Sequence, residues 1–153
     1  MSFIFANVKI LGSIAFDAFP AFIGGLILGK GFGAVIGAFG HLLTALLSGF
    51  PYTLPVHIIV AVLMAITVYL FTLTYNLIAE TSNKMIASVC ASIIGAALNG
   101  PFSVFALQPF LLPMMGEAGL FSFSIILTTT SLANIILSFV VFFALLKSKF
   151  LDR

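Results

Sequence analysis

Charged residues are scarce in this chain. Of its 153 residues only 7% are Asp, Glu, Lys or Arg, whereas 62% are hydrophobic. So little charge cannot cover the surface of a water-soluble globule, and the composition therefore excludes an ordinary soluble domain. The sequence predicts an all-α integral membrane protein, and we expect residues 1–153 to form a single transmembrane domain.

Residue patterns that support catalysis are also missing. No phosphate loop of the Gly-x-x-x-x-Gly-Lys-Ser/Thr type occurs, so we expect no ATP hydrolysis by the chain itself. The two histidines lack a cysteine or acidic partner at ligand spacing, and no serine or cysteine nucleophile has a recognisable base. The sequence predicts no catalytic residue, no metal site, no cofactor and no nucleic-acid partner. An intramembrane enzyme is therefore the weakest alternative.

Cysteine is scarce as well, and a clear signal-peptide pattern is missing. Cys90 is the only cysteine, so it cannot form an internal disulfide, and its place in an apolar run predicts a packing role. Lys9 interrupts the first apolar stretch, and no small-residue cleavage pattern stands out. We therefore expect no cleavable signal peptide.

The apolar runs predict a bundle of six helices, the first of them short or incomplete. The sharpest turn is Gly29-Lys30-Gly31, which lies between two apolar segments and predicts a tight helical hairpin in the membrane. Asn99-Gly100-Pro101 predicts a kink or a helix end, because proline lacks an N–H donor. We expect the helices at about residues 2–14, 18–29, 32–48, 55–78, 84–99 with a bent extension to about 112, and 120–147.

Small residues recur at helical spacing in the hairpin. Gly25-x-x-x-Gly29 and Gly33-x-x-x-Gly37 both allow helices to approach closely. The spacing predicts tight packing, either inside the chain or with a partner helix.

Basic residues decide the expected orientation. If the C-terminus is cytoplasmic, alternating spans place five of the six basic residues on the cytoplasmic side. We therefore expect a multi-pass protein of a prokaryotic plasma membrane with both termini in the cytoplasm. The five residues are Lys30, Lys84, Lys147, Lys149 and Arg153.

Polar side chains at membrane depth are the candidates for function, because each is costly there unless it meets a partner, water or a ligand. His41 and Thr44 are spaced i, i+3 and share a helix face, and His57 opens the next span. Two histidines on neighbouring helices suggest a pocket, although a hydrogen-bonded core histidine and an interfacial His57 are the plain alternatives. Asp17 either caps a helix or binds a ligand.

Further candidates lie later in the chain. Asn99 stands beside carbonyls freed by Pro101, which suits a bond to a heterocycle or a sugar hydroxyl but also suits a simple kink. Asn134 follows the hydroxyl run 128–131, most of whose members we expect to bond back to their own helix. Phenylalanines near the outer turns either pack or stack on an aromatic ligand. The predicted substrate-binding set is Asp17, Phe19, His41, Thr44, Tyr52, His57, Asn99, Phe102, Gln108 and Asn134.

The hairpin resembles a known family. Residues Asp17–Gly29, DAFPAFIGGLILG, and Gly33–Leu43, GAVIGAFGHLL, are similar to the signature of substrate-binding S components of energy-coupling factor (ECF) transporters. The resemblance implies six membrane helices around a vitamin site that opens to the outside. It also implies docking on a transmembrane coupling protein that is driven by two ATPase subunits.

A narrower similarity suggests a substrate. Residues Gly40–Leu46, GHLLTAL, with Gly49–Pro51 and Leu54–His57, resemble the S-component subgroup assigned to α-ribazole, a nucleoside precursor of cobalamin. The similarity implies a scavenger that takes up a vitamin precursor for cobalamin salvage. An S component for another vitamin is an open alternative.

Specific roles follow from joining the resemblance to the polar residues. We expect His41, Asn99 and Asn134 to hydrogen-bond the ligand, with Asp17 and His57 toward the ribose. Residues 1–16 lack the Ala-x-x-x-Ala docking face usual in the family, so either the chain begins late or it docks elsewhere. A structural or assembly subunit of a membrane complex also remains open.

Overall fold

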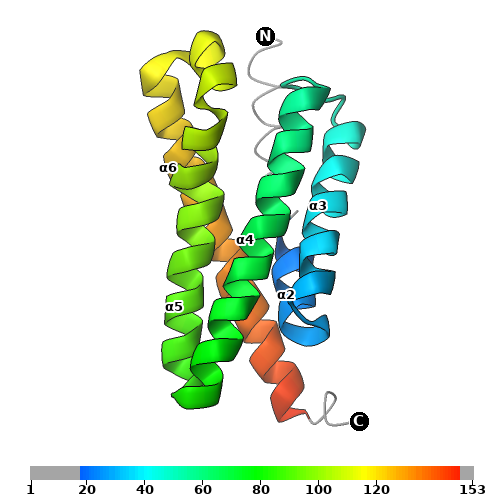
Figure 1. Cartoon of the computed structure of the whole chain (residues 1–153), viewed down its shortest axis with the longest axis vertical. Helices are drawn as coiled ribbons and strands as arrows, with labels where there is room; N and C mark the ends of the chain where they lie inside the picture. Colours follow the sequence, from blue (N-terminus) through cyan, green and yellow to red (C-terminus); the bar gives the residue numbers. More distant parts are fainter. Residues whose placement is uncertain (1–17, 149–153) are drawn as a thin grey trace.

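The structure is a computed structural model, and it describes residues 18–148. Nearly all of these residues are helical, and no strand occurs among them, so the predicted all-α class is confirmed for this part of the chain. The elements are α2 (Phe19–Leu28), α3 (Lys30–Leu47), α4 (Leu54–Thr81), α5 (Lys84–Ala97), the π-helical turn η1 (Leu98–Phe102) and α6 (Ser103–Lys147), as Figure 1 shows.

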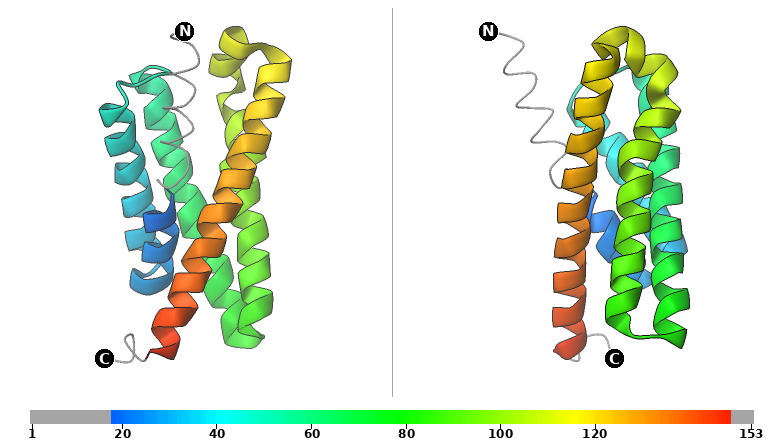
Figure 2. Two further views of the ribbon diagram at one scale, coloured as in Figure 1. Left: turned by 180° about the vertical axis from the view of Figure 1, so that it is seen from behind. Right: turned by 90° about the vertical axis from the view of Figure 1, so that its left-hand side faces the viewer.

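The expected count of six helices is not what the described residues show. They form four helical stretches, because α5, η1 and α6 follow one another without a break from Lys84 to Lys147. Inside α6 only Gly116 departs from helical backbone angles, with φ 68° and ψ 178°. At that point α6 reverses and runs back along the bundle (Figure 2). The helix expected at residues 2–14 lies outside the described residues.

Asn99-Gly100-Pro101 widens the helix instead of ending it. Pro101 lies inside η1, where its missing N–H removes one backbone hydrogen bond. The Ser103 hydroxyl donates to the Leu98 carbonyl at 2.7 Å, so a carbonyl of this turn receives a side-chain donor. The chain therefore continues into α6, whose own Pro109 and Pro113 also fail to end it.

Three described helical stretches are long and apolar enough to cross a membrane, namely Lys30–Leu47, Leu54–Thr81 and Lys84–Lys147, while α2 is a shorter apolar helix. Large apolar side chains cover the outer surface of the bundle. This surface suits lipid and is unfavourable in water, so the protein is a membrane protein. Exposed examples are Phe32, Phe39, Leu47, Phe105 and Phe121.

Glycines bring α2, α3 and α4 into close contact. A Cβ atom on Gly33 would lie 2.5 Å from the Cα atom of Gly25, and a Cβ atom on Gly25 would collide with the Thr72 hydroxyl. The turn between α2 and α3 needs only Gly29, whose φ of 97° favours glycine. Gly25 and Gly33 each belong to one of the two Gly-x-x-x-Gly pairs. Of the two alternatives, packing inside the chain or with a partner helix, they therefore serve the first.

Two apolar clusters hold the bundle at its two ends. Phe22, Phe71 and Ile135 are fully buried in the first cluster, which joins α2, α4 and α6. Val56 and Leu111 belong to the second, which joins α4 to the first half of α6. Polar side chains gather between these clusters.

Candidate functional site

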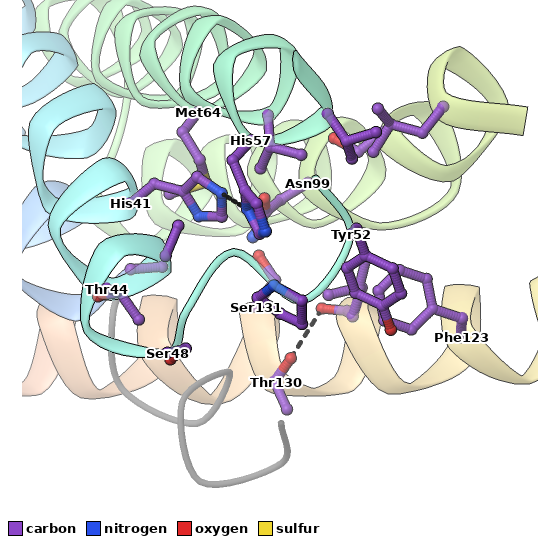
Figure 3. A pocket seen from close by; sticks show the side chains of 18 of the residues that line it. His41, Thr44, Ser48, Tyr52, His57, Met64, Asn99, Phe123, Thr130 and Ser131 are labelled. Atoms are coloured by element: carbon purple, nitrogen blue, oxygen red, sulfur yellow. Dashed lines mark hydrogen bonds between the residues drawn. The ribbon is translucent and has the colours of Figure 1, made fainter. Parts of the chain in front are cut away.

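A cavity of about 440 Å³ lies between the two apolar clusters. Its walls come from α3, the connection of residues 48–53, α4, η1 and both halves of α6 (Figure 3). Its volume falls in the range of small-molecule sites. The polar side chains that line it are His41, Thr44, Ser48, Tyr52, His57, Asn99, Ser103, Thr130, Ser131 and Asn134.

The structure gathers much of the predicted substrate-binding set at this cavity. The members that line it are His41, Thr44, Tyr52, His57, Asn99 and Asn134. They come from segments far apart in sequence, and they share a wall because α3, α4 and α6 pack around the same space. Asp17 lies outside the described residues.

Three predicted residues do not line the cavity. Ser103, Leu107 and Leu111, spaced four apart, turn one face of α6 to the cavity, whereas Phe102 and Gln108 lie off that face and are exposed. Phe19 is half-buried away from the cavity, and its backbone carbonyl accepts a bond from the Ser138 hydroxyl at 3.4 Å. A role for these three residues in substrate binding therefore stays a prediction. For Phe102 and Gln108, the sequence does not reveal the rotational phase of the helix beyond the kink.

The two histidines of the chain form a direct pair. Nε2 of His41 on α3 lies 3.1 Å from Nδ1 of His57 on α4, and the ring centroids are 5.3 Å apart (Figure 3). His57 is only 6% exposed, and its Nε2 atom has no hydrogen-bond partner among the described residues. The pair therefore leaves one buried imidazole nitrogen available at the cavity.

Aromatic rings form the wall beside His57. The Phe50 and Tyr52 rings lie 5.7 and 6.3 Å from the His57 ring, and the Phe123 ring of α6 lies 6.1 Å from Tyr52. Phe50 and Thr53 both have positive φ, so the connection is tightly bent where it presents Tyr52. Burial raises the pKa of the Tyr52 hydroxyl above its usual 10.0, so the group stays a neutral hydrogen-bond donor and acceptor.

Hydroxyl groups on α6 divide into two kinds. Those of Thr128, Thr129 and Thr130 donate to carbonyls four residues earlier, at 2.7, 2.8 and 2.9 Å, as the sequence predicts. Ser131 differs, because its hydroxyl is buried at the cavity without a hydrogen-bond partner in the described part of the chain. Asn134, in contrast, donates from Nδ2 to the Thr130 carbonyl at 2.8 Å.

The predicted substrate-binding set therefore lacks Ser131, along with Ser103 and Phe123. A helical pattern contained the signal for two of them. Phe123, Leu127, Ser131 and Asn134 follow one face of α6 at spacings of four, four and three residues. Extending that face from Asn134 would have found Phe123 and Ser131.

Full charges are missing from the described wall of the cavity. None of the lining residues is Asp, Glu, Lys or Arg. The polar groups are imidazoles, amides and hydroxyls, which exchange hydrogen bonds with an uncharged ligand. A grouping of three or more His, Cys, Asp or Glu that would hold a metal ion is also missing from residues 18–148.

Comparison with protein families assigns the chain. A family model described as ECF transporter, substrate-specific component, matches residues 1–146. The chain belongs to this family. An ECF substrate-specific component is a transporter subunit, and the family implies a ligand and coupling to transmembrane and ATPase modules. Comparison with curated proteins gave no match, and comparison with solved structures gave none.

Proposed function

We propose that this ECF substrate-specific component binds α-ribazole, or a closely similar uncharged nucleoside, in the cavity between α3, α4 and α6. Two buried polar atoms carry the proposal, namely Nε2 of His57 and Oγ of Ser131. A buried polar atom without a partner costs roughly 1–3 kcal/mol. Two such atoms on different helices, beside one cavity, are explained by a ligand that bonds both.

The chemistry of the wall supports a heteroaromatic nucleoside. Tyr52 and Phe123 offer ring faces and edges against which a flat base packs. Asn99 and Ser131 offer an amide and a hydroxyl, which suit ring nitrogens and ribose hydroxyls. A benzimidazole riboside such as α-ribazole needs both the aromatic surface and the hydrogen-bonding groups.

Charge distribution supports uptake from outside. The start of α3, the connection between α4 and α5 and the end of α6 lie at one end of the bundle (Figure 1), and these positions carry Lys30, Lys84 and Lys147. The opposite end holds the bend at Gly116 and the connection of residues 48–53 that lines the cavity. By the positive-inside rule the lysine end is cytoplasmic, so the cavity end faces outward. A coupling protein and its two ATPases then receive the loaded subunit and drive release inside.

Calorimetric titration of the purified protein in nanodiscs tests the proposal. We expect α-ribazole to bind at micromolar concentration or tighter, and Ser131→Ala to weaken binding about tenfold, as for one lost hydrogen bond. Ser122→Ala is the matched control, because Ser122 is exposed on the same helix and bonds only the Ala118 carbonyl, at 2.9 Å.

Other outcomes point to the alternatives. If a different vitamin bound and Ser131→Ala weakened that binding, the cavity would stand as the binding site. That vitamin would then replace α-ribazole as the proposed substrate. No binding of α-ribazole or of any vitamin tested would remove the uptake proposal and favour an assembly subunit, which needs no small solute.

A further inference from the structure

We propose that His57 is the histidine that contacts the ligand, through Nε2, and that His41 is a positioning residue that fixes the His57 ring. The proposal rests on the ligand-binding role proposed above for the cavity. It replaces the expectation that His41 hydrogen-bonds the ligand while His57 lies toward the ribose.

The hydrogen bond between the rings carries the assignment. Nε2 of His41 is already engaged with Nδ1 of His57 at 3.1 Å. The nitrogen of His57 that remains is Nε2, which is buried, has no partner in residues 18–148 and belongs to a cavity-lining side chain. A ligand in the cavity gains a bond at this atom without breaking the pair.

The pairing also restricts the protons of both rings. If His41 donates from Nε2, Nδ1 of His57 is bare, and a neutral His57 carries its proton on Nε2. If His57 donates from Nδ1, Nε2 of His41 is bare, and a neutral His41 carries its proton on Nδ1. Either way the two neutral rings hold the same tautomer, and two fully protonated rings cannot keep the bond.

The surroundings hold the His57 ring in place. The rings of Phe50 and Tyr52 flank it, and the His57 backbone N–H donates to the Thr53 carbonyl at 3.3 Å. Among the described lining residues, His41 and Tyr52 are the only other titratable groups facing it, and no fully charged side chain does. The ring therefore presents Nε2 in one orientation, with its proton set by His41.

Ser131 supplies the second contact. His57 projects into the cavity from α4 and Ser131 from the returning half of α6 (Figure 3). Both polar atoms are buried and unpartnered in the described structure. A ligand that bonds both links α4 to α6.

Amide substitutions separate the two histidine roles. A glutamine amide reaches about as far as Nε2 of histidine, and an asparagine amide about as far as Nδ1. We expect His57→Asn, which keeps a partner for His41 but loses the ligand contact, to bind α-ribazole about tenfold or more weakly. His41→Gln, which keeps the bond to His57, should bind within about threefold of the unmodified protein, whereas His41→Ala should lose about tenfold.

Thermal unfolding of each variant separates loss of contact from loss of fold. Unchanged affinity in a folded His57→Asn variant, with loss in His41→Gln, would reverse the roles and overturn the proposal. The same loss in His41→Gln and His41→Ala would also overturn it, because a positioning residue must be rescued by the conservative change.

Histidine nitrogen NMR gives a readout that a purely structural role would not move. The chain has two histidines, so ¹⁵N-histidine labelling of the full protein in nanodiscs yields two rings. Without ligand we expect the same tautomer in both rings. Added α-ribazole should shift Nε2 of His57 most.

Each NMR outcome decides a separate question. Opposite tautomers in the two rings would overturn the pairing, whatever the ligand. A shift confined to His41 would overturn the assignment of the contact to His57. If α-ribazole neither binds nor shifts either ring, the substrate proposal and this contact both fail, while matched tautomers still support His41 as the residue that sets the His57 ring.

Discussion

Gly100 of η1 packs directly against Thr128 of α6. A Cβ atom on Gly100 would lie 3.0 Å from the Cα atom of Thr128 and would collide with its hydroxyl. This contact holds the π-helical turn, and with it Asn99, against the returning half of α6. Neither partner can move away easily, because the nearby atoms include backbone.

Gly100→Ala should therefore disturb the cavity as well as the packing. We expect a loss of about 1–3 kcal/mol in stability from overpacking, and weaker α-ribazole binding because Asn99 is displaced. Thermal unfolding and calorimetry in nanodiscs measure the two effects. Gly40→Ala is the control, because a Cβ atom on Gly40 of α3 would meet nothing within 4 Å. Equal stability of the two variants would contradict the prediction.

The hairpin of α2 and α3 offers a second matched pair. Gly33→Ala places a methyl group 2.5 Å from the Cα atom of Gly25 and 2.7 Å from its nitrogen, so the helices must separate. Gly31→Ala lies two residues earlier and meets nothing within 4 Å. We expect Gly33→Ala to cost about 1–3 kcal/mol and Gly31→Ala to be neutral or slightly stabilising. Unfolding temperatures check this, and equal values would show that the helices do not need this close approach.

Part of the fold could be predicted from the sequence because lipid imposes strong rules. The apolar runs predict membrane helices, and Gly29 marks the sharp turn between α2 and α3. The helix count could not be deduced in the same way. Pro113 and Gly116 predict a gap between a helix that ends near residue 112 and one that begins near residue 120, whereas in the structure only Gly116 departs from helical angles inside α6.

In the candidate site, too, the sequence predicts some of the residues and not others. His41, His57 and Asn99 were singled out because polar groups are costly in lipid, and the structure places them at one cavity. The sequence does not distinguish Ser131 from its three threonine neighbours, because all four hydroxyls can bond back to their own helix. Only the rotational phase of α6 distinguishes the hydroxyl that faces the cavity.

Tyr52 should make stability depend on pH above the ordinary tyrosine range. Burial raises its pKa in the folded protein above the usual 10.0, so the unfolded chain loses the proton first. Stability is therefore unaffected by this group below about pH 10 and falls as pH rises through the raised pKa. We expect Tyr52→Phe to lose less stability than the unmodified protein as the pH rises above about 10, measured by thermal unfolding. If the stability of the two proteins fell equally with rising pH, the result would contradict burial of the Tyr52 hydroxyl.

The uncharged wall of the cavity predicts discrimination against phosphate. The described lining offers imidazoles, amides and hydroxyls but no lysine or arginine, so a phosphate dianion would be buried without a counter-charge. We expect α-ribazole 5′-phosphate to bind at least about 100-fold more weakly than α-ribazole, measured by competition calorimetry. Ser131→Arg, which adds a cation at the wall, should narrow that difference, while Ser122→Arg on the exposed face of the same helix should leave it unchanged. Equal affinity of nucleoside and nucleotide in the unmodified protein would contradict the prediction.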